Sequence, residues 1–383
     1  MKHIILRCED GASPSAKVAP LWEGAKLAHL QQLAQAGAAG VIRHTGRAKA
    51  LDRFSVHRAL LGLDGKAPEA APARCYAATA GVQLAPEETA WCCELVTQQD
   101  GKISDPTAGN IPTKEGEILV QAINHQLGSE TKRWEVGNGS HHLLITHDEV
   151  FATDDPQVVR PPELLAGQRW NRCLPKGALG HAVNLLIEQA MELLEDHPIN
   201  RVRVDLGENP ANMIWLWGPA RGPIRKTFRE RTGLSGAVLS HSFPMRGFAQ
   251  SLGLGWKEAP AALDEPAFHR LLKSTTALLE HDDLVYVHLR VDSADPVVRL
   301  CTMERIDQVF LKSLTEHLPH DGSWRLLAAI DDRTNTGVPF VAIGKGLPQQ
   351  PIAHLNAHSF AESPLTFDVR DGLFTWFTRT HEG

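Results

Sequence analysis

Aspartates close three apolar, strand-like runs of this chain. HIILRCED ends in Asp10, DLVYVHLRVD ends in Asp292, and WRLLAAIDD ends in Asp331 and Asp332. In open α/β sheets, ligands bind outside the carboxyl ends of the strands. Carboxylates gathered there repel one another unless a cation or protons neutralise them, and their oxygens suit hard cations such as magnesium or manganese. We therefore predict that Asp10, Asp331 and Asp332 hold one divalent ion. Asp292 is a fourth candidate ligand, and the alternative is that these aspartates cap helices or form turns.

Short apolar runs alternate along the chain with amphipathic stretches of helical period. This alternation favours an α/β fold in which a mainly parallel sheet is flanked by helices. Strands are expected over 3–10, 211–218, 236–243, 283–292 and 324–332. Helices are expected over 26–37, 180–196, 265–280 and 302–317. Parallel strands would bring their carboxyl ends, and the aspartates that follow them, to one edge of the sheet.

The middle of the chain has a different pattern. Residues 89–170 show a strand, turn, short helix and strand without a repeated strand–helix–strand unit, and they include a hairpin candidate that turns at Gln-Asp-Gly. We predict that this segment is a smaller α+β cap domain inserted into the core. The core domain would then be discontinuous and consist of residues 1–88 and 171–383.

Composition excludes several classes of protein. Of the 383 residues, 43% are hydrophobic and 22% are charged, which is typical of a globular chain and not of a disordered one. The formal net charge of −6 disfavours nucleic acid as a partner. No run approaches the length of about 18 apolar residues that a membrane span needs, and the N-terminal residues lack the features of a signal peptide. We therefore expect no membrane partner and a cytoplasmic location.

Three segments carry a resemblance to a known family: NPANMIWLWGPARGP at 209–223, FRERTGLSGAVLS at 228–240 and LEHDDLVYVH at 279–288. Weaker matches lie at 59–65, 94–111, 141–146, 174–177 and 195–203. In these segments the chain resembles the archaeal-type cofactor-independent phosphoglycerate mutases of the alkaline phosphatase superfamily. The resemblance implies an alkaline-phosphatase-like core and a cap domain that closes over the substrate. It also implies two manganese-type ions and a serine nucleophile, which move a phosphoryl group between two hydroxyls of glycerate through a phosphoserine.

This chain has other residues at most of the positions that would carry this chemistry. Counting back from residues 60–62 places Arg53 at the serine position, so Ser55 could be the catalytic nucleophile only after a local shift in register. The family's acidic run ending in histidine corresponds to residues 292–296, which contain no histidine, and its aspartate–histidine pair corresponds to residues 331–332. Because such losses fall on metal and phosphate ligands while scaffold segments survive, we infer that the fold was kept and the two-metal chemistry was lost.

The motifs that face the substrate differ as well, at residues 71–74, 107–110 and 161–164 and at His141, where the family has arginine. The remaining candidates for substrate binding are Arg221, Arg246, Asp264 and His288. Both arginines stand at positions that stay basic in the family. They could bind an anion, or they could form structural ion pairs.

Three functional hypotheses remain open. In the first, the protein is a repurposed relative that binds, or acts differently on, a small anionic metabolite in a cleft between core and cap. It would need no organic cofactor, and it could pair with a second copy or with a pathway protein. In the second, it is a metal-dependent phosphoryl-transfer enzyme with one manganese or magnesium ion at the aspartates. In the third, it is a mutase whose missing ligands are supplied by His288, His354 and His358.

Overall fold

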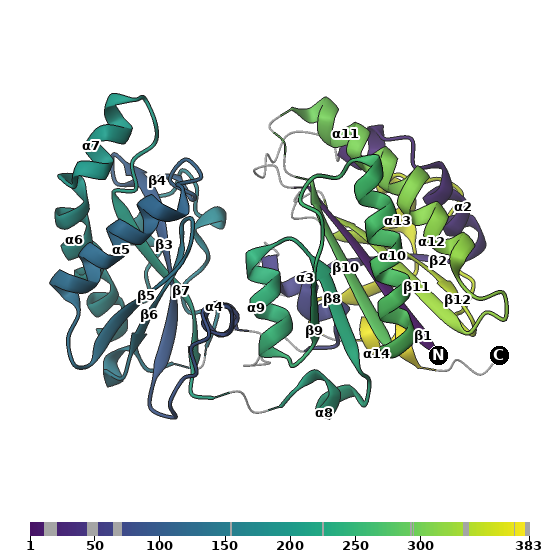
Figure 1. Ribbon diagram of the computed structural model, residues 1–383, viewed down its shortest axis with the longest axis horizontal. Coiled ribbons are helices and arrows are strands. Elements are labelled where there is room, and N and C mark those ends of the chain that lie inside the picture. The colour runs from purple at the N-terminus through teal and green to yellow at the C-terminus, as the bar shows by residue number, and fades with distance from the viewer. Residues whose placement is uncertain are drawn as a thin grey trace. The chain divides into compact units, whose positions relative to one another are not determined.

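The computed structural model describes residues 1–10, 21–43, 53–63, 71–153, 155–223, 226–291, 293, 295–331, 337–370 and 372–379 (Figure 1). At residues 10, 21, 53 and 331 it describes the backbone alone. The chain divides into two units, each of which is described by itself. The core unit comprises residues 1–65, 227–249 and 253–383, and the second unit comprises residues 66–226 with 250–252.

Among the described residues, the core unit contains an eight-stranded sheet in the order β13-β2-β12-β11-β1-β10-β8-β9. Its strands are β1 (Lys2–Asp10), β2 (Ala38–Arg43), β8 (Gly236–Ser240), β9 (Gly255–Glu258), β10 (Leu284–Val291), β11 (Trp324–Asp331), β12 (Val338–Gly344) and β13 (Leu365–Asp368). Only β12 runs antiparallel to its neighbours in this described sheet. The predicted α/β class with a large, mostly parallel sheet is confirmed.

The two faces of this sheet differ in chemistry because side chains alternate along each strand. On β1, Ile4, Leu6 and Cys8 join a large apolar cluster on one face. The helices that contribute to this cluster are α1 (Leu21–Gly24), α2 (Ala28–Ala36), α10 (Glu265–His281), α11 (Pro296–Arg305), the π-helical stretch η5 (Ile306–Leu311), α12 (Lys312–His317) and α13 (Ala357–Glu362). Helices α3 (Arg53–Leu60) and α9 (Phe243–Ser251) lie on the opposite face (Figure 1). Short helices α8 (Phe228–Thr232) and α14 (Leu373–Thr378) complete the core unit in its described part.

The second unit contains an antiparallel sheet in which β3 pairs with β4, β6 and β7, and β5 pairs with β6. Its strands are β3 (Thr89–Gln99), β4 (Lys102–Asp105), β5 (Lys132–Asn138), β6 (His141–Thr146) and β7 (Met213–Arg221). Its main helices are α4 (Pro72–Thr79), α5 (Thr113–Leu127), α6 (Ala178–Glu195) and α7 (Pro198–Asp205). Short 3-10 turns lie at Glu149–Phe151, Pro162–Leu164 and Trp170–Arg172.

The second unit extends beyond the predicted insertion of residues 89–170. It also includes residues 66–88 and 171–226. The physical reason is β7, the strand expected over 211–218, which pairs with β3 and not with a strand of the core sheet. In the described part of the chain, no helix combines the length and apolar character needed to cross a bilayer.

Candidate metal centre in a buried polar layer

The core sheet carries buried polar side chains on the face where α3 lies. Arg7 and Glu9 alternate with the apolar residues of β1, and Arg7 is the register partner of His288 on the adjacent parallel strand β10. Arg7, Glu9 and His288 are 1%, 4% and 1% exposed. Charged groups at this depth are costly unless they are paired. Arg7 Nη2 lies 3.9 Å from Glu9 Oε2, so the guanidinium offsets part of the charge of this carboxylate.

Two histidines meet beside Glu9 and are held by hydroxyl groups. His288 Nε2 lies 3.0 Å from Glu9 Oε2, and His288 Nδ1 lies 2.8 Å from Ser240 Oγ at the end of β8. His57, on α3, has its Nδ1 atom 2.5 Å from Tyr286 Oη. The two imidazole rings form an edge contact with centroids 5.0 Å apart. The strand register and the helix together therefore orient both rings.

Glu9, His57 and His288 form the one group of three or more metal-ligating side chains found among the described residues. One ligand atom from each lies within 4.8 Å of the others. Burial lowers the pKa of His57 well below its usual value, and the nearby Arg7 acts in the same direction. Burial also lowers the pKa of His288, although Glu9 opposes the shift. Both rings are therefore neutral near pH 7, which is the form that binds metal ions. We call these three residues the histidine–glutamate cluster.

The backbone places the strand-end positions Asp10 and Asp331 at the same edge of the sheet. Asp10 ends β1 and Asp331 ends β11, and Glu9 is the register partner of Asp331. The side chains of Asp10 and Asp331 are outside the described part, and so are residues Asp292 and Asp332 altogether. Strands β11, β1 and β10 are parallel neighbours. The predicted aspartate site therefore remains a prediction, supported by the placement of the strands.

Sequence reasoning did not single out Glu9 or assign His57 to a metal site. The signal that could have found Glu9 was the polar side of the alternation in HIILRCED. No local pattern could have found His57, because its partners are far away in the chain. Of the other histidines considered, His354 is exposed, and the exposed His358 pairs with Glu362 at 3.3 Å.

The remaining predicted site residues have diverse surroundings. Ser55 lies on α3 and is 4% exposed. Asp264 is the N-cap of α10, where its carboxylate accepts a hydrogen bond from the Ala267 amide at 2.8 Å. Arg246 is exposed on α9. In the second unit, Arg221 ends β7, and its Nη2 atom lies 3.5 Å from Glu149.

Residues of the second unit at the substrate-facing positions named above make bonds within that unit. Arg74 is buried and donates to the carbonyl oxygens of Gly222 and Arg221, at 2.6 and 2.8 Å. His141 Nδ1 lies 2.5 Å from a carboxylate oxygen of the buried Glu94, which also accepts a hydrogen bond from Tyr76. These polar groups therefore support the local fold.

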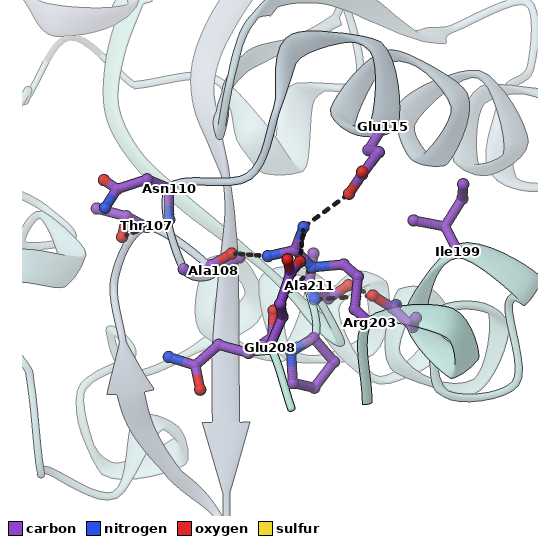
Figure 2. A network of polar contacts seen from close by, with 12 residues as sticks. Thr107, Ala108, Asn110, Glu115, Ile199, Arg203, Glu208 and Ala211 are labelled. Carbon is purple, nitrogen blue, oxygen red and sulfur yellow. Dashed lines mark hydrogen bonds and ion pairs between the residues drawn. The ribbon is translucent and has the colours of Figure 1, made fainter. Parts of the chain in front are cut away.

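The loop at residues 107–110 is held by Arg203 (Figure 2). Arg203 Nη2 donates to the carbonyl oxygen of Ala108 at 2.9 Å, Nε donates to that of Asn209 at 2.9 Å, and Nη1 donates to Glu115 at 2.6 Å. Ala108 and Asn110 adopt positive φ angles of 48° and 54°. Non-glycine residues rarely adopt this conformation unless the surroundings impose it. The buried guanidinium is one of the contacts that impose it.

Comparisons with known proteins agree with this fold. Residues 34–200 match the family described as 2,3-bisphosphoglycerate-independent phosphoglycerate mutase. The enzyme of that name from Methanosarcina acetivorans is 37% identical over 215 residues, which are 56% of this chain and 53% of that protein. Its counterpart from Methanosarcina mazei is 30% identical over 269 residues, which are 70% of this chain and 67% of that protein.

The match therefore spans only about half the length of the first of these relatives. A solved cofactor-independent phosphoglycerate mutase from Thermoplasma acidophilum has a similar fold, with a TM-score of 0.55, 21% identity and coverage of 98% of each chain. Together with the strand order of the core and the sequence identity to the Methanosarcina enzymes, this places the chain in the family of 2,3-bisphosphoglycerate-independent phosphoglycerate mutases.

Proposed function

We propose that this protein binds a small anionic metabolite on a phosphoglycerate mutase scaffold and does not catalyse the phosphoserine reaction. The observation that carries the proposal is the position of Ser55. It is the only serine or threonine between residues 53 and 63, and it is 4% exposed on α3. A nucleophilic hydroxyl must reach the phosphoryl group of its substrate and be activated there. A buried helical serine, two residues after the arginine that stands at the expected nucleophile position, is poorly suited to that role.

Polar side chains of the second unit that already form hydrogen bonds within that unit support the same proposal. Arg74 donates to two backbone carbonyl oxygens, and His141 contacts a buried carboxylate. A phosphoglycerate bound by these groups would have to replace hydrogen bonds that already stabilise the unit. The ligand would instead be recognised by a more accessible guanidinium group, and Arg246 of the core unit is exposed. Guanidinium groups suit carboxylate and phosphate oxygens because their donors can form paired hydrogen bonds.

Two measurements on the purified full chain test this proposal. Phosphorus NMR of 3-phosphoglycerate, with manganese present, measures conversion to 2-phosphoglycerate. Isothermal titration calorimetry measures binding of 3-phosphoglycerate and of inorganic phosphate. We expect binding that weakens when Arg246 is replaced by methionine, without conversion at an enzymatic rate. Turnover within the usual range of about 1–1000 per second, abolished by Ser55→Ala, would overturn the proposal.

A second candidate is phosphoryl transfer at a single divalent ion, and the side-by-side ends of the parallel strands β1 and β11 are the observation that favours it. Such an ion would polarise a phosphoryl oxygen as a Lewis acid. The predicted site of Asp10, Asp331 and Asp332 would hold this ion. Hydrolysis of p-nitrophenyl phosphate that depends on added metal and is lost in Asp10→Asn would favour this candidate over metabolite binding alone.

A further inference from the structure

We propose that the core unit binds one divalent transition-metal ion of the zinc type between Glu9, His57 and His288. This site differs from the aspartate set predicted from the sequence. It also differs from the serine, aspartate and histidine positions that the family resemblance implies. It does not depend on which reaction, if any, the protein catalyses. The argument rests on the donor atoms, on their supporting hydrogen bonds and on the place of the cluster in the sheet.

The donor set is one that transition metals prefer. Two imidazoles and one carboxylate bind zinc in many proteins, with bonds of about 2.0–2.2 Å. Ligand atoms around such a tetrahedral ion are about 3.4 Å apart, as these bond lengths require. His288 Nε2 and Glu9 Oε2 are already 3.0 Å apart, and all three ligand atoms lie within 4.8 Å of one another. Insertion of an ion would therefore need small side-chain movements and no change in strand register.

The second nitrogen of each histidine is already held by a hydroxyl group. Ser240 Oγ lies 2.8 Å from His288 Nδ1, and Tyr286 Oη lies 2.5 Å from His57 Nδ1. Such outer hydrogen bonds orient metal-binding imidazoles and select their tautomer. When Nδ1–H of His288 donates to Ser240, the lone pair of Nε2 is available to an ion. In this tautomer Nε2 and the Glu9 carboxylate face each other as acceptors, and an ion between them would bind both.

Charge is the main argument against an ion at this position. Arg7 lies 3.9 Å from Glu9 and already offsets its charge, so an ion adds uncompensated positive charge to a buried cluster. A cluster whose charges are balanced without an ion is the competing outcome of the test.

Burial predicts how tightly such an ion would be retained. Glu9, His57 and His288 are 4%, 2% and 1% exposed, so an ion among them would exchange slowly with solvent. It would have the closed environment of a structural site, which contributes its binding energy to folding. We therefore expect the ion to survive dialysis and to be removed only by a strong chelator in mild denaturant. Its removal should lower the unfolding temperature of the chain.

The test begins with the wild-type chain. The protein is stripped with chelator, reconstituted with zinc or with cobalt, and freed of excess metal. Elemental mass spectrometry counts the bound ions, and the visible absorption of cobalt reports its coordination by nitrogen and oxygen ligands. We expect about one ion per chain, as a single site requires. Absence of retained zinc and of a cobalt spectrum in the refolded wild-type chain would overturn the proposal without any variant.

Variants then locate the ion. His57→Gln and His288→Gln should each lower metal affinity at least tenfold, and Ser240→Ala should lower it by about 10–100-fold through loss of the outer hydrogen bond. His142→Gln is the matched control, because His142 is a buried histidine of the second unit that lies outside the cluster. Circular dichroism and thermal melts establish which variants fold, and only folded variants are titrated with cobalt.

The double variant Asp10→Asn/Asp331→Asn separates this site from the aspartate site. Retention of the ion in this variant, together with its loss in the His57 and His288 variants, supports the proposal. The opposite pattern would assign the ion to the aspartates and overturn it. An ion retained by all of these folded variants would overturn it as well, because the ion would then lie elsewhere.

Discussion

Replacement of Arg203 by methionine should destabilise the second unit far more than the same change at Arg201, which lies two residues earlier on α7. Arg203 is 3% exposed and donates to the buried Ala108 carbonyl group, to the Asn209 carbonyl group and to Glu115. An unsatisfied buried carbonyl group costs about 1–3 kcal/mol, and each ordinary hydrogen bond contributes about 0.5–1.5 kcal/mol. Glu115 and Glu208 have partly exposed side chains that can regain water, so their release adds little.

We therefore expect Arg203→Met to lower the free energy of unfolding by about 2–4 kcal/mol, because methionine preserves the apolar stem but leaves the Ala108 carbonyl group without its donor. Arg201→Met is the matched control. The ion pair of Arg201 with Asp196 is exposed, so its loss should cost less than about 1 kcal/mol. Urea unfolding, followed by tryptophan fluorescence and circular dichroism, measures both changes.

Hydrogen exchange provides a local measurement for the same pair of variants. The Gly109 amide donates to Asp105 within the loop that Arg203 holds. In Arg203→Met this amide should exchange at least about tenfold faster, because the loop opens without global unfolding. Equal stability losses in the two variants, or unchanged exchange at Gly109, would refute the view that Arg203 holds the loop.

Three further predictions concern other parts of the chain. Burial lowers the pKa of His142 to about 4, so the unfolded state binds more protons than the folded state between this pH and about 6.5. The free energy of unfolding should therefore fall as the pH is lowered through that window. Urea titrations at several pH values should show a shallower fall in folded His142→Gln. Gly40→Ala should lower the free energy of unfolding by about 1–3 kcal/mol, because the added carbon would lie 2.4 Å from a backbone oxygen of β13. Gly24→Ala is the control, because its added carbon has room, and it should cost less in the same urea assay. Burial raises the pKa of the Cys8 thiol to about 12, whereas Cys301 is exposed. Iodoacetamide should therefore label Cys301 in the folded chain and leave Cys8 unmodified, which mass spectrometry measures. Labelling of both thiols at equal rates would contradict this prediction.

The hydrophobic pattern was sufficient to predict β1, β8, β10 and β11, four neighbouring strands of the core sheet, but not β2, β9, β12 and β13. The expected strand over 3–10 is β1, and the expected helix over 265–280 is α10. The pattern also identified β7 as a buried strand but not its partner. Its apolar run, IWLW, would suit the interior of either sheet, and only the pairing with β3 assigns it to the second unit. Strand pairing between distant segments is a tertiary property that local periodicity does not contain.

For the candidate sites, local sequence determined the family, the alternation of strands and helices, and the aspartates at the strand ends. These features depend on residues that are close together in the sequence or on the order of segments along the chain. Only the tertiary structure decided that His288 contacts Glu9, from which it is separated by 279 positions, and that His57 lies beside them. The physical reason is that a parallel sheet places distant strands side by side, and a helix packed on its polar face then contributes the third donor.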